Sequence, residues 1–145
     1  MATMILANAT VSGDRGYAQR ITTTGGHTLP SDEPERRGGT NTGAAPFDLM
    51  LSSLGACTAI TMRMYADRKQ WNLGATEVKL RLIKEGDDPL RIERTLIVSQ
   101  PLDAEQQAKL LEIADKTPVT KALAPGLPIH TVFGTANARR DFTRN

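Results

Sequence analysis

The sequence predicts an α+β fold, because two kinds of hydrophobic periodicity occupy separate parts of the chain. Apolar side chains recur at helical spacing from Pro46 to about Arg68. Residues 76–84 and 91–98 instead alternate between apolar and polar side chains around a turn at residues 85–89. That alternation is typical of an antiparallel hairpin with one buried face. We therefore expect strand-rich ends around a central helix.

The N-terminal segment is predicted to form short strands. Residues 4–11 and 17–23 are rich in apolar and β-branched side chains, and they flank a turn at residues 12–16. The pair Gly25-Gly26 indicates another turn, which leads to a third short strand at residues 27–29. This segment should add antiparallel strands to those of the hairpin.

A long loop at residues 31–43 precedes the central helix. Its glycine-rich end is not followed by the Lys-Ser/Thr pair of a phosphate-binding loop. We interpret Asp32 and the neighbouring acids as solvated side chains. Pro46 suits the first turn of the helix, where its missing N–H has no cost. Loops of this length in small domains are often functional.

The C-terminal part is predicted to contain two helices and a closing strand. Asp103 is suited to cap a helix that runs to about Lys116, since Gln106 follows at the third helical position. Thr117 is suited to cap a short helix over residues 118–123. Residues 129–133, Ile-His-Thr-Val-Phe, are predicted to form the closing strand.

Length and composition indicate an ordinary globular protein. The chain has 145 residues, of which 39% are hydrophobic and 23% charged, and a net charge of +2. We expect one domain over residues 1–145, with residues 134–145 as a flexible tail. Because the net charge is small, neither nucleic acid nor a membrane is an expected partner. The apolar stretch 43–62 approaches the length of a membrane span, but Pro46 and Asp48 interrupt it.

Cys57 is the only cysteine of the chain and lies within the predicted central helix. It can be a small core residue, a reactive thiolate or half of an intermolecular disulfide. Two histidines and one cysteine are too scattered for a zinc motif, so neither a metal nor another cofactor is expected. A single cysteine and a start without the features of a signal peptide favour the cytoplasm.

The segment Gly38–Lys69 resembles the family of osmotically inducible protein C (OsmC) and organic hydroperoxide resistance (Ohr) proteins. The resemblance rests on a proline followed by an acid, two helical turns of small and apolar residues, and the pair Ala56-Cys57. Residues 27–34 and 113–123 match further segments of the same family in the same order. The resemblance implies antiparallel sheets that wrap two central helices in an intertwined homodimer.

The resemblance also implies that the protein reduces organic hydroperoxides in oxidative-stress defence. Cys57 falls on the position of the peroxide-attacking cysteine. Arg20, or failing that Arg15, matches the arginine that polarises this thiol. Asp48 is the nearest match for the family's acid, which many members carry one residue earlier, where this chain has Phe47.

A second position departs from the family pattern. Thr117 occupies the place of the second cysteine, so an oxidised Cys57 needs an external thiol as reductant. Phe47, Met50 and Leu51 are expected to line an apolar substrate pocket. The alternatives to a one-cysteine peroxidase are a member that only binds a small apolar ligand in the dimer pocket, and a purely structural dimer.

Overall fold

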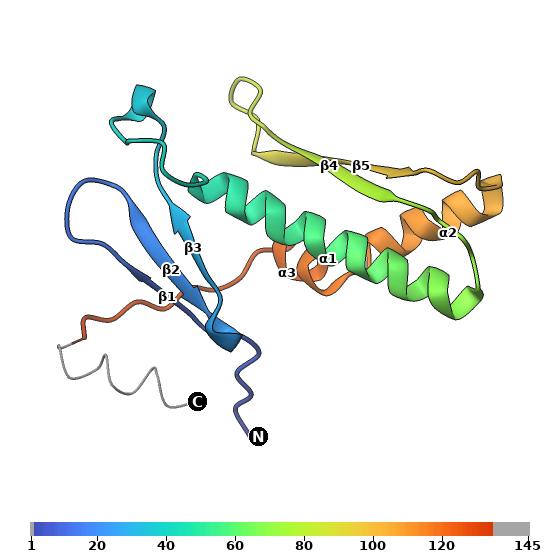
Figure 1. Ribbon diagram of the computed structural model, residues 1–145, viewed down its shortest axis with the longest axis horizontal. Coiled ribbons are helices and arrows are strands. Elements are labelled where there is room, and N and C mark those ends of the chain that lie inside the picture. The colour runs from blue at the N-terminus through green and yellow to red at the C-terminus, as the bar shows by residue number, and fades with distance from the viewer. Residues whose placement is uncertain (1, 135–145) are drawn as a thin grey trace.

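The computed structural model describes residues 2–134 and has the α+β architecture with antiparallel sheets that the sequence predicts (Figure 1). The N-terminal part contains strands β1 (Ala9–Ser12), β2 (Gln19–Thr23) and β3 (Thr28–Ser31), followed by the long helix α1 (Pro46–Lys69). The C-terminal part contains strands β4 (Thr76–Ile83) and β5 (Arg91–Val98) and helices α2 (Ala104–Ala114) and α3 (Pro118–Leu123). Helix α1 packs against β4 of the hairpin and also against α2 and α3 (Figure 1).

The N-terminal sheet has the order β1-β2-β3, with antiparallel neighbours. The predicted first strand, residues 4–11, is too long at its N-terminal end. Ala9 pairs with Thr23, and beyond Thr23 the chain leaves the sheet through a turn in which Gly25 has a φ of 84°. Consequently no strand of the described chain lies beside residues 4–7 to complete a hydrogen-bond ladder.

The predicted hairpin is confirmed, with β4 and β5 paired along their full lengths from Thr76↔Val98 to Ile83↔Arg91. Helix α1 packs closely on its inner face. A Cβ added at Gly55 would lie 2.8 Å from Cδ1 of Leu80, so glycine at this position lets the helix approach the strand. The hairpin therefore fixes the rotation of α1 about its axis.

The buried core lies at the C-terminal half of α1. Met62 and Ala66 of α1 pack there with Leu73 and with Leu110 of α2. At the edge of this core Trp71 meets the Tyr65 ring edge to face, with 5.5 Å between the ring centroids. No helix within residues 2–134 is long and apolar enough to cross a membrane.

The predicted closing strand at residues 129–133 is wrong for this structure. The segment is extended but carries no ladder, because no other described strand lies alongside it. Its apolar side chains are exposed, and Phe133 is 107% exposed relative to a free residue. Of the tail expected at residues 134–145, all but Gly134 lies outside the described residues.

Candidate functional site

The loop before α1 is organised around the carboxylate of Asp32. It accepts hydrogen bonds from the hydroxyls of Thr40 at 2.6 Å and Thr42 at 2.8 Å, and from the backbone N–H of Glu33 at 2.8 Å. The Thr40 hydroxyl, followed by that of Thr42, holds the pKa of Asp32 far below its usual range. The interpretation of Asp32 as a solvated acid is wrong: the residue is buried and structural.

Two further contacts hold this loop against the start of α1. A Cβ at Gly39 would lie 1.9 Å from the carbonyl oxygen of Glu33, so no larger residue fits without moving the backbone. The hydroxyl of Ser31 donates to the carbonyl of Ala44 at 2.8 Å. These contacts fix the position of the loop relative to Pro46, the first residue of α1.

We expect Asp32→Asn to destabilise the protein in a pH-dependent way. A carboxyl whose pKa is lowered on folding stabilises the native state above its unfolded pKa, about 3.9, and this contribution is lost as the pH falls through the folded pKa. The variant should unfold at lower urea concentration than wild type at pH 7, and the difference should shrink below about pH 4. Glu35→Gln, at an exposed residue of the same loop, is the matched control. A difference that does not depend on pH would contradict this account.

Cys57 lies in the middle of α1 and is half-buried rather than part of the core. It shares a helix face with Ile60 and Met64, which are 60% and 51% exposed. Among the described residues no hydrogen bond reaches its sulfur, and its carbonyl accepts from the hydroxyl of Thr61 at 2.7 Å. The thiol therefore borders an apolar surface that the described part of the chain leaves uncovered.

The structure does not bring Arg20 and Asp48 together with Cys57 within the described chain. Arg20 is exposed on β2, and among residues 2–134 no hydrogen bond or ion pair joins it to either residue. The Asp48 carboxylate accepts from the backbone N–H of Ala45 at 3.2 Å and so caps the helix. At about 1.5 Å of rise per residue, Asp48 lies roughly 14 Å from Cys57 along the axis. It can act on the thiol only through an intervening group.

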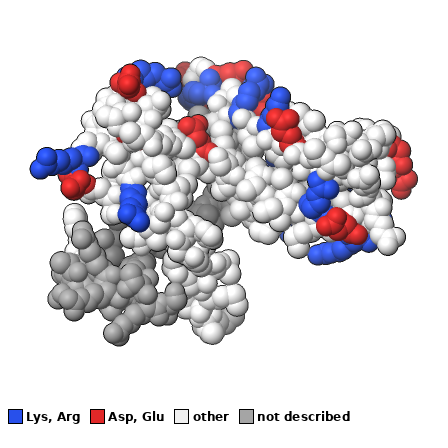
Figure 2. Space-filling view, viewed as in Figure 1, with Lys and Arg blue, Asp and Glu red and all other residues white. Residues whose placement is uncertain are grey.

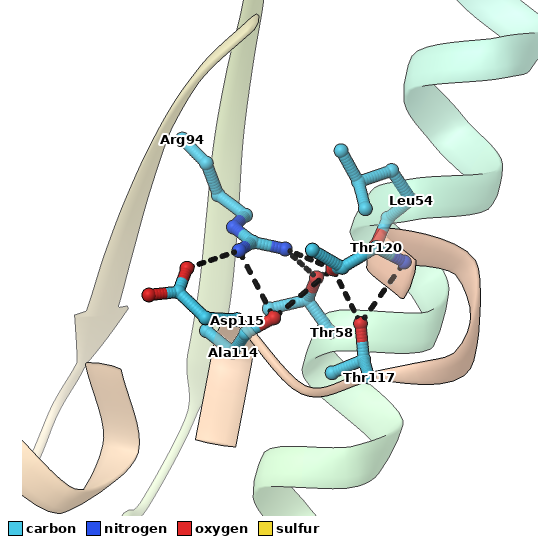
Figure 3. Close-up of polar contacts among 7 residues, drawn as sticks. All are labelled: Leu54, Thr58, Arg94, Ala114, Asp115, Thr117 and Thr120. Atoms are coloured by element: carbon cyan, nitrogen blue, oxygen red, sulfur yellow. Dashed lines mark hydrogen bonds and ion pairs between the residues drawn. The ribbon is translucent and has the colours of Figure 1, made fainter. Parts of the chain in front are cut away.

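Thr117, at the second-cysteine position, is fully buried and caps α3. Its hydroxyl lies 2.6 Å from the hydroxyl of Thr120, which in turn lies 3.0 Å from the carbonyl of Ala114. Figure 3 shows these groups facing α1 beside the guanidinium of Arg94. The position is thus part of a polar cluster between α1, α3 and β5.

Arg94 is the centre of this cluster. Its Nη1 donates to the hydroxyls of Thr58 and Thr120, both at 2.9 Å, and its Nη2 donates to the carbonyl of Ala114 at 3.0 Å. A longer contact of 3.4 Å joins Nη2 to the carboxylate of Asp115. One side chain from β5 thereby links α1 to the end of α2 and to α3 (Figure 3).

The hydroxyl hydrogens of the cluster can be assigned without conflict. The Thr58 hydroxyl donates to the carbonyl of Leu54 at 2.7 Å and accepts from Arg94. The Thr120 hydroxyl donates to Ala114, so the Thr117 hydroxyl must donate to Thr120. No buried side-chain nitrogen or oxygen of the described residues lacks a partner.

Sequence reasoning missed Arg94, although a signal was present. In an alternating strand, residues two apart lie on one face, and Arg94 has the same parity as Ile92 and Leu96. An arginine on the inward face of a hairpin must be paired or must line a cavity. Here it does both.

A pocket of about 630 Å³ lies between the N-terminal half of α1, the hairpin and the α2–α3 segment. Phe47 and Met50, two of the predicted pocket residues, line it together with Arg94. Leu51 lies instead over a shallow depression against β4, next to Asp48 and Gly55. Among the described residues, Cys57 is not part of the lining of the larger pocket.

Comparisons with known proteins agree with this arrangement of elements. The family model described as OsmC-like protein matches residues 39–132, which include α1, the hairpin, α2 and α3. No curated protein matches the chain.

Several solved structures are similar to the chain. An osmotic stress induced and detoxification response protein from Psychrobacter arcticus has a TM-score of 0.67 and 21% identity, over 83% of this chain and 89% of its own. An organic hydroperoxide resistance protein OsmC from Legionella pneumophila has a TM-score of 0.61 and 17% identity, over 83% and 90%. The organic hydroperoxide resistance protein OhrB of Bacillus subtilis has a TM-score of 0.54 and 26% identity, over 81% and 89%.

Proposed function

Because the chain belongs to the OsmC-like protein family, whose model matches residues 39–132, we propose that it reduces organic hydroperoxides through the thiol of Cys57. The observation that carries this proposal is the setting of the chain's sole cysteine. It is half-buried beside the exposed apolar side chains of Ile60 and Met64 instead of lying in the core. A peroxide with an apolar substituent can approach such a thiol, whereas a cysteine sealed in the core would be inert.

The proposed step is a two-electron transfer. The Cys57 thiolate attacks one oxygen of the peroxide, the S–O bond forms and the O–O bond breaks. The leaving alkoxide takes up a proton and departs as an alcohol. The sulfur is oxidised to a sulfenic acid, and the peroxide is reduced.

Reduction of the sulfenic acid requires a thiol from outside the chain, because Thr117 stands where the family has its second cysteine. A first external thiol condenses with the sulfenic acid and releases water. A second external thiol then attacks the external sulfur of the mixed disulfide. This releases the Cys57 thiol and a disulfide of the two external thiols. Without such a reductant, further peroxide converts the sulfenic acid to sulfinic acid.

Arg20 and Asp48 are proposed to polarise the thiol, with the arginine placed between the acid and the sulfur. The roughly 14 Å along α1 between Asp48 and Cys57 calls for such a bridging group. Arg20 is exposed on β2, and we propose that its guanidinium takes this place on assembly. Phe47, Met50 and Leu51 are proposed to surround the organic part of the substrate.

Mass spectrometry of Cys57 after stoichiometric cumene hydroperoxide, with hydrogen peroxide in parallel, tests the proposal. We expect one added oxygen on Cys57, formed faster with the organic peroxide. Arg20→Ala should slow the reaction about tenfold or more. The loss of a pKa shift of about one unit in the thiol changes the thiolate population by about a factor of ten. Arg15→Ala, in the preceding turn, tests the second match for this arginine and should leave the rate unchanged if Arg20 has the role.

An unmodified Cys57 under excess organic peroxide would remove the peroxidase proposal. The ligand-binding function, in which an apolar molecule occupies the pocket of the assembled protein, would then take its place. Co-purification of such a molecule, seen by native mass spectrometry, would support that reading. Loss of rate with Arg15→Ala but not with Arg20→Ala would move the polarising role to Arg15.

We propose further that the protein works as a homodimer. Strand β1 is exposed at every residue, and the neighbouring β2 has only half-buried and exposed residues within the described chain. Ile60 and Met64 of α1 and the segment 129–133 are exposed as well. On the viewed face, charged side chains lie along the hairpin, near the C-terminal end of α1, over the loop before α1 and at the outer end of the N-terminal sheet, with uncharged surface between these groups (Figure 2). A second copy would bury these apolar surfaces.

Light scattering at micromolar concentration should therefore give twice the mass of the chain. Unfolding should depend on protein concentration, because folding and association are coupled in an obligate dimer. Met64→Glu places a charge on the exposed face of α1 and should weaken the dimer, while Asp67→Ala on the same helix should not. A monomeric mass with native circular dichroism would contradict this prediction.

A further inference from the structure

We propose that the pocket containing Arg94 binds a carboxylate carried on an apolar chain, and that this site is separate from Cys57. The pocket encloses about 630 Å³, within the range of about 300–1,000 Å³ usual for small-molecule sites. Cys57 is not among the described residues that line it. The pocket shares Phe47 and Met50 with the substrate pocket proposed above, but binding at Arg94 does not require the peroxide chemistry of Cys57.

The walls of the pocket suit an alkyl or aryl chain. Helix α1 contributes Phe47 and Met50, the hairpin contributes Leu90 and Ile92, and Leu111 of α2 closes the opposite side. Three of these side chains, Phe47, Leu90 and Leu111, are more than half exposed, which is unusual for large apolar residues gathered around one cavity. A bound apolar chain would remove this surface from water.

The charge of Arg94 suits an anionic head group. The Arg94 side chain is only 13% exposed, and most of its hydrogen bonds go to neutral acceptors. Its one carboxylate contact among the described residues is Asp115, at 3.4 Å and with a side chain 81% exposed. Charge-assisted pairs are usually shorter, about 2.7–2.9 Å. The positive charge is therefore poorly neutralised for its burial.

The second arginine at the pocket is already paired. Arg91 lies 2.9 Å from the carboxylate of Glu85 and 3.3 Å from that of Glu93. Arg94 is left as the cation available to a ligand in the pocket.

The remaining donors of Arg94 match a carboxylate fork. Within residues 2–134, Nε has no hydrogen-bond acceptor, and no fully buried polar side-chain atom lacks a partner, so Nε is not fully buried. Nε and Nη2 form one edge of the guanidinium, and a carboxylate can accept from both at once. It would displace the long Asp115 contact, and the released Asp115 carboxylate would return to water. One edge accommodates a carboxylate with both oxygens engaged.

Isothermal titration calorimetry with decanoate and with decanol tests the assignment. Wild type should bind decanoate at least tenfold more tightly than decanol. Arg94→Met should abolish this preference, and Arg81→Met, at an exposed arginine of the same hairpin, should keep it. Leu111→Trp at the pocket mouth keeps Arg94 intact and should weaken both ligands, so the site is tested even if Arg94→Met folds poorly. Cys57→Ser should bind decanoate as wild type does.

Three results would overturn the proposal. Equal affinity for the acid and the alcohol would remove the role of Arg94 toward a carboxylate. Loss of decanoate binding in Cys57→Ser would place the ligand at the thiol instead. Failure of wild type to bind either molecule, with a shift of Leu111→Trp to monomeric mass, would show that a second copy of the chain covers the pocket.

Discussion

Arg94→Met should lower the free energy of unfolding by about 2–3 kcal/mol, a large effect for one side chain of a protein of this size. The substitution removes the donors that link α1 to the end of α2 and to α3. Hydrogen bonds from a charged group contribute about 1.5–3 kcal/mol, but removal also relieves the cost of burying the charge. Urea denaturation at fixed protein concentration measures the change.

The acceptors left behind limit the size of this effect. The Thr58 hydroxyl still donates to Leu54, and the carbonyl of Ala114 still accepts from Thr120. No buried acceptor of the cluster is therefore left without a partner. The loss comes from the missing link between elements, so Thr120→Val and Arg94→Met should be less than additive. Additive effects would contradict a shared cluster, and Arg81→Met should change stability little.

The parts of the fold that were predictable are those set by local periodicity. In β4 and β5, inward-facing apolar residues alternate with outward-facing polar residues, so the sequence shows which side chains are buried. In α1 the helical spacing of apolar residues continues for many turns. The helix starts were equally legible, because Asp103 and Thr117 each accept a backbone N–H as N-cap. These features depend on neighbours within a few residues.

The closing strand could not be predicted in the same way. Whether an extended, apolar segment such as 129–133 becomes a strand depends on an available partner strand. Residues 4–7 failed for the same reason, since β2 ends at Thr23. Propensity can identify a segment that could form a strand, but pairing is a property of the tertiary or quaternary arrangement.

The candidate site was also predictable only in part. The family motif located Cys57 and Thr117 in the sequence, whereas the surroundings of Thr117 emerged only from the packing of α3 on α1. Asp32 was misread because an acid in a loop is usually solvated. Two threonines that follow it in the sequence fold back to donate their hydroxyls to it. A sequence shows which residues can donate or accept hydrogen bonds. It does not show which of them come together in one buried cluster.

Thr117→Cys should convert the proposed one-cysteine chemistry into a two-cysteine cycle. In wild type, excess cumene hydroperoxide without added thiol should carry Cys57 past the sulfenic acid to the sulfinic acid. In the variant, the new thiol should attack the sulfenic acid, release water and close an internal disulfide. Intact-mass spectrometry distinguishes the products, since over-oxidation adds two oxygens and the disulfide removes two hydrogens.

The structure sets the conditions for this result. Thr117 is fully buried at the start of α3, and α3 packs against α1. A thiol of similar size fits there, at the loss of a hydroxyl that donates to Thr120 and caps the helix. That loss should destabilise the reduced variant by about 1–2 kcal/mol. The disulfide further requires Cα atoms about 4.4–6.8 Å apart.

Lys121→Cys is the control, because it places a second thiol on the exposed side of the same short helix. It should leave the over-oxidation of Cys57 unchanged, since the two thiols do not face each other. Over-oxidation of Thr117→Cys at the wild-type rate would show that position 117 is beyond reach of the thiol. Protection in both variants would instead indicate disulfides between dimers. If Thr117→Cys alone protects Cys57 from over-oxidation, the absence of an internal disulfide step in wild type is due to the residue at position 117.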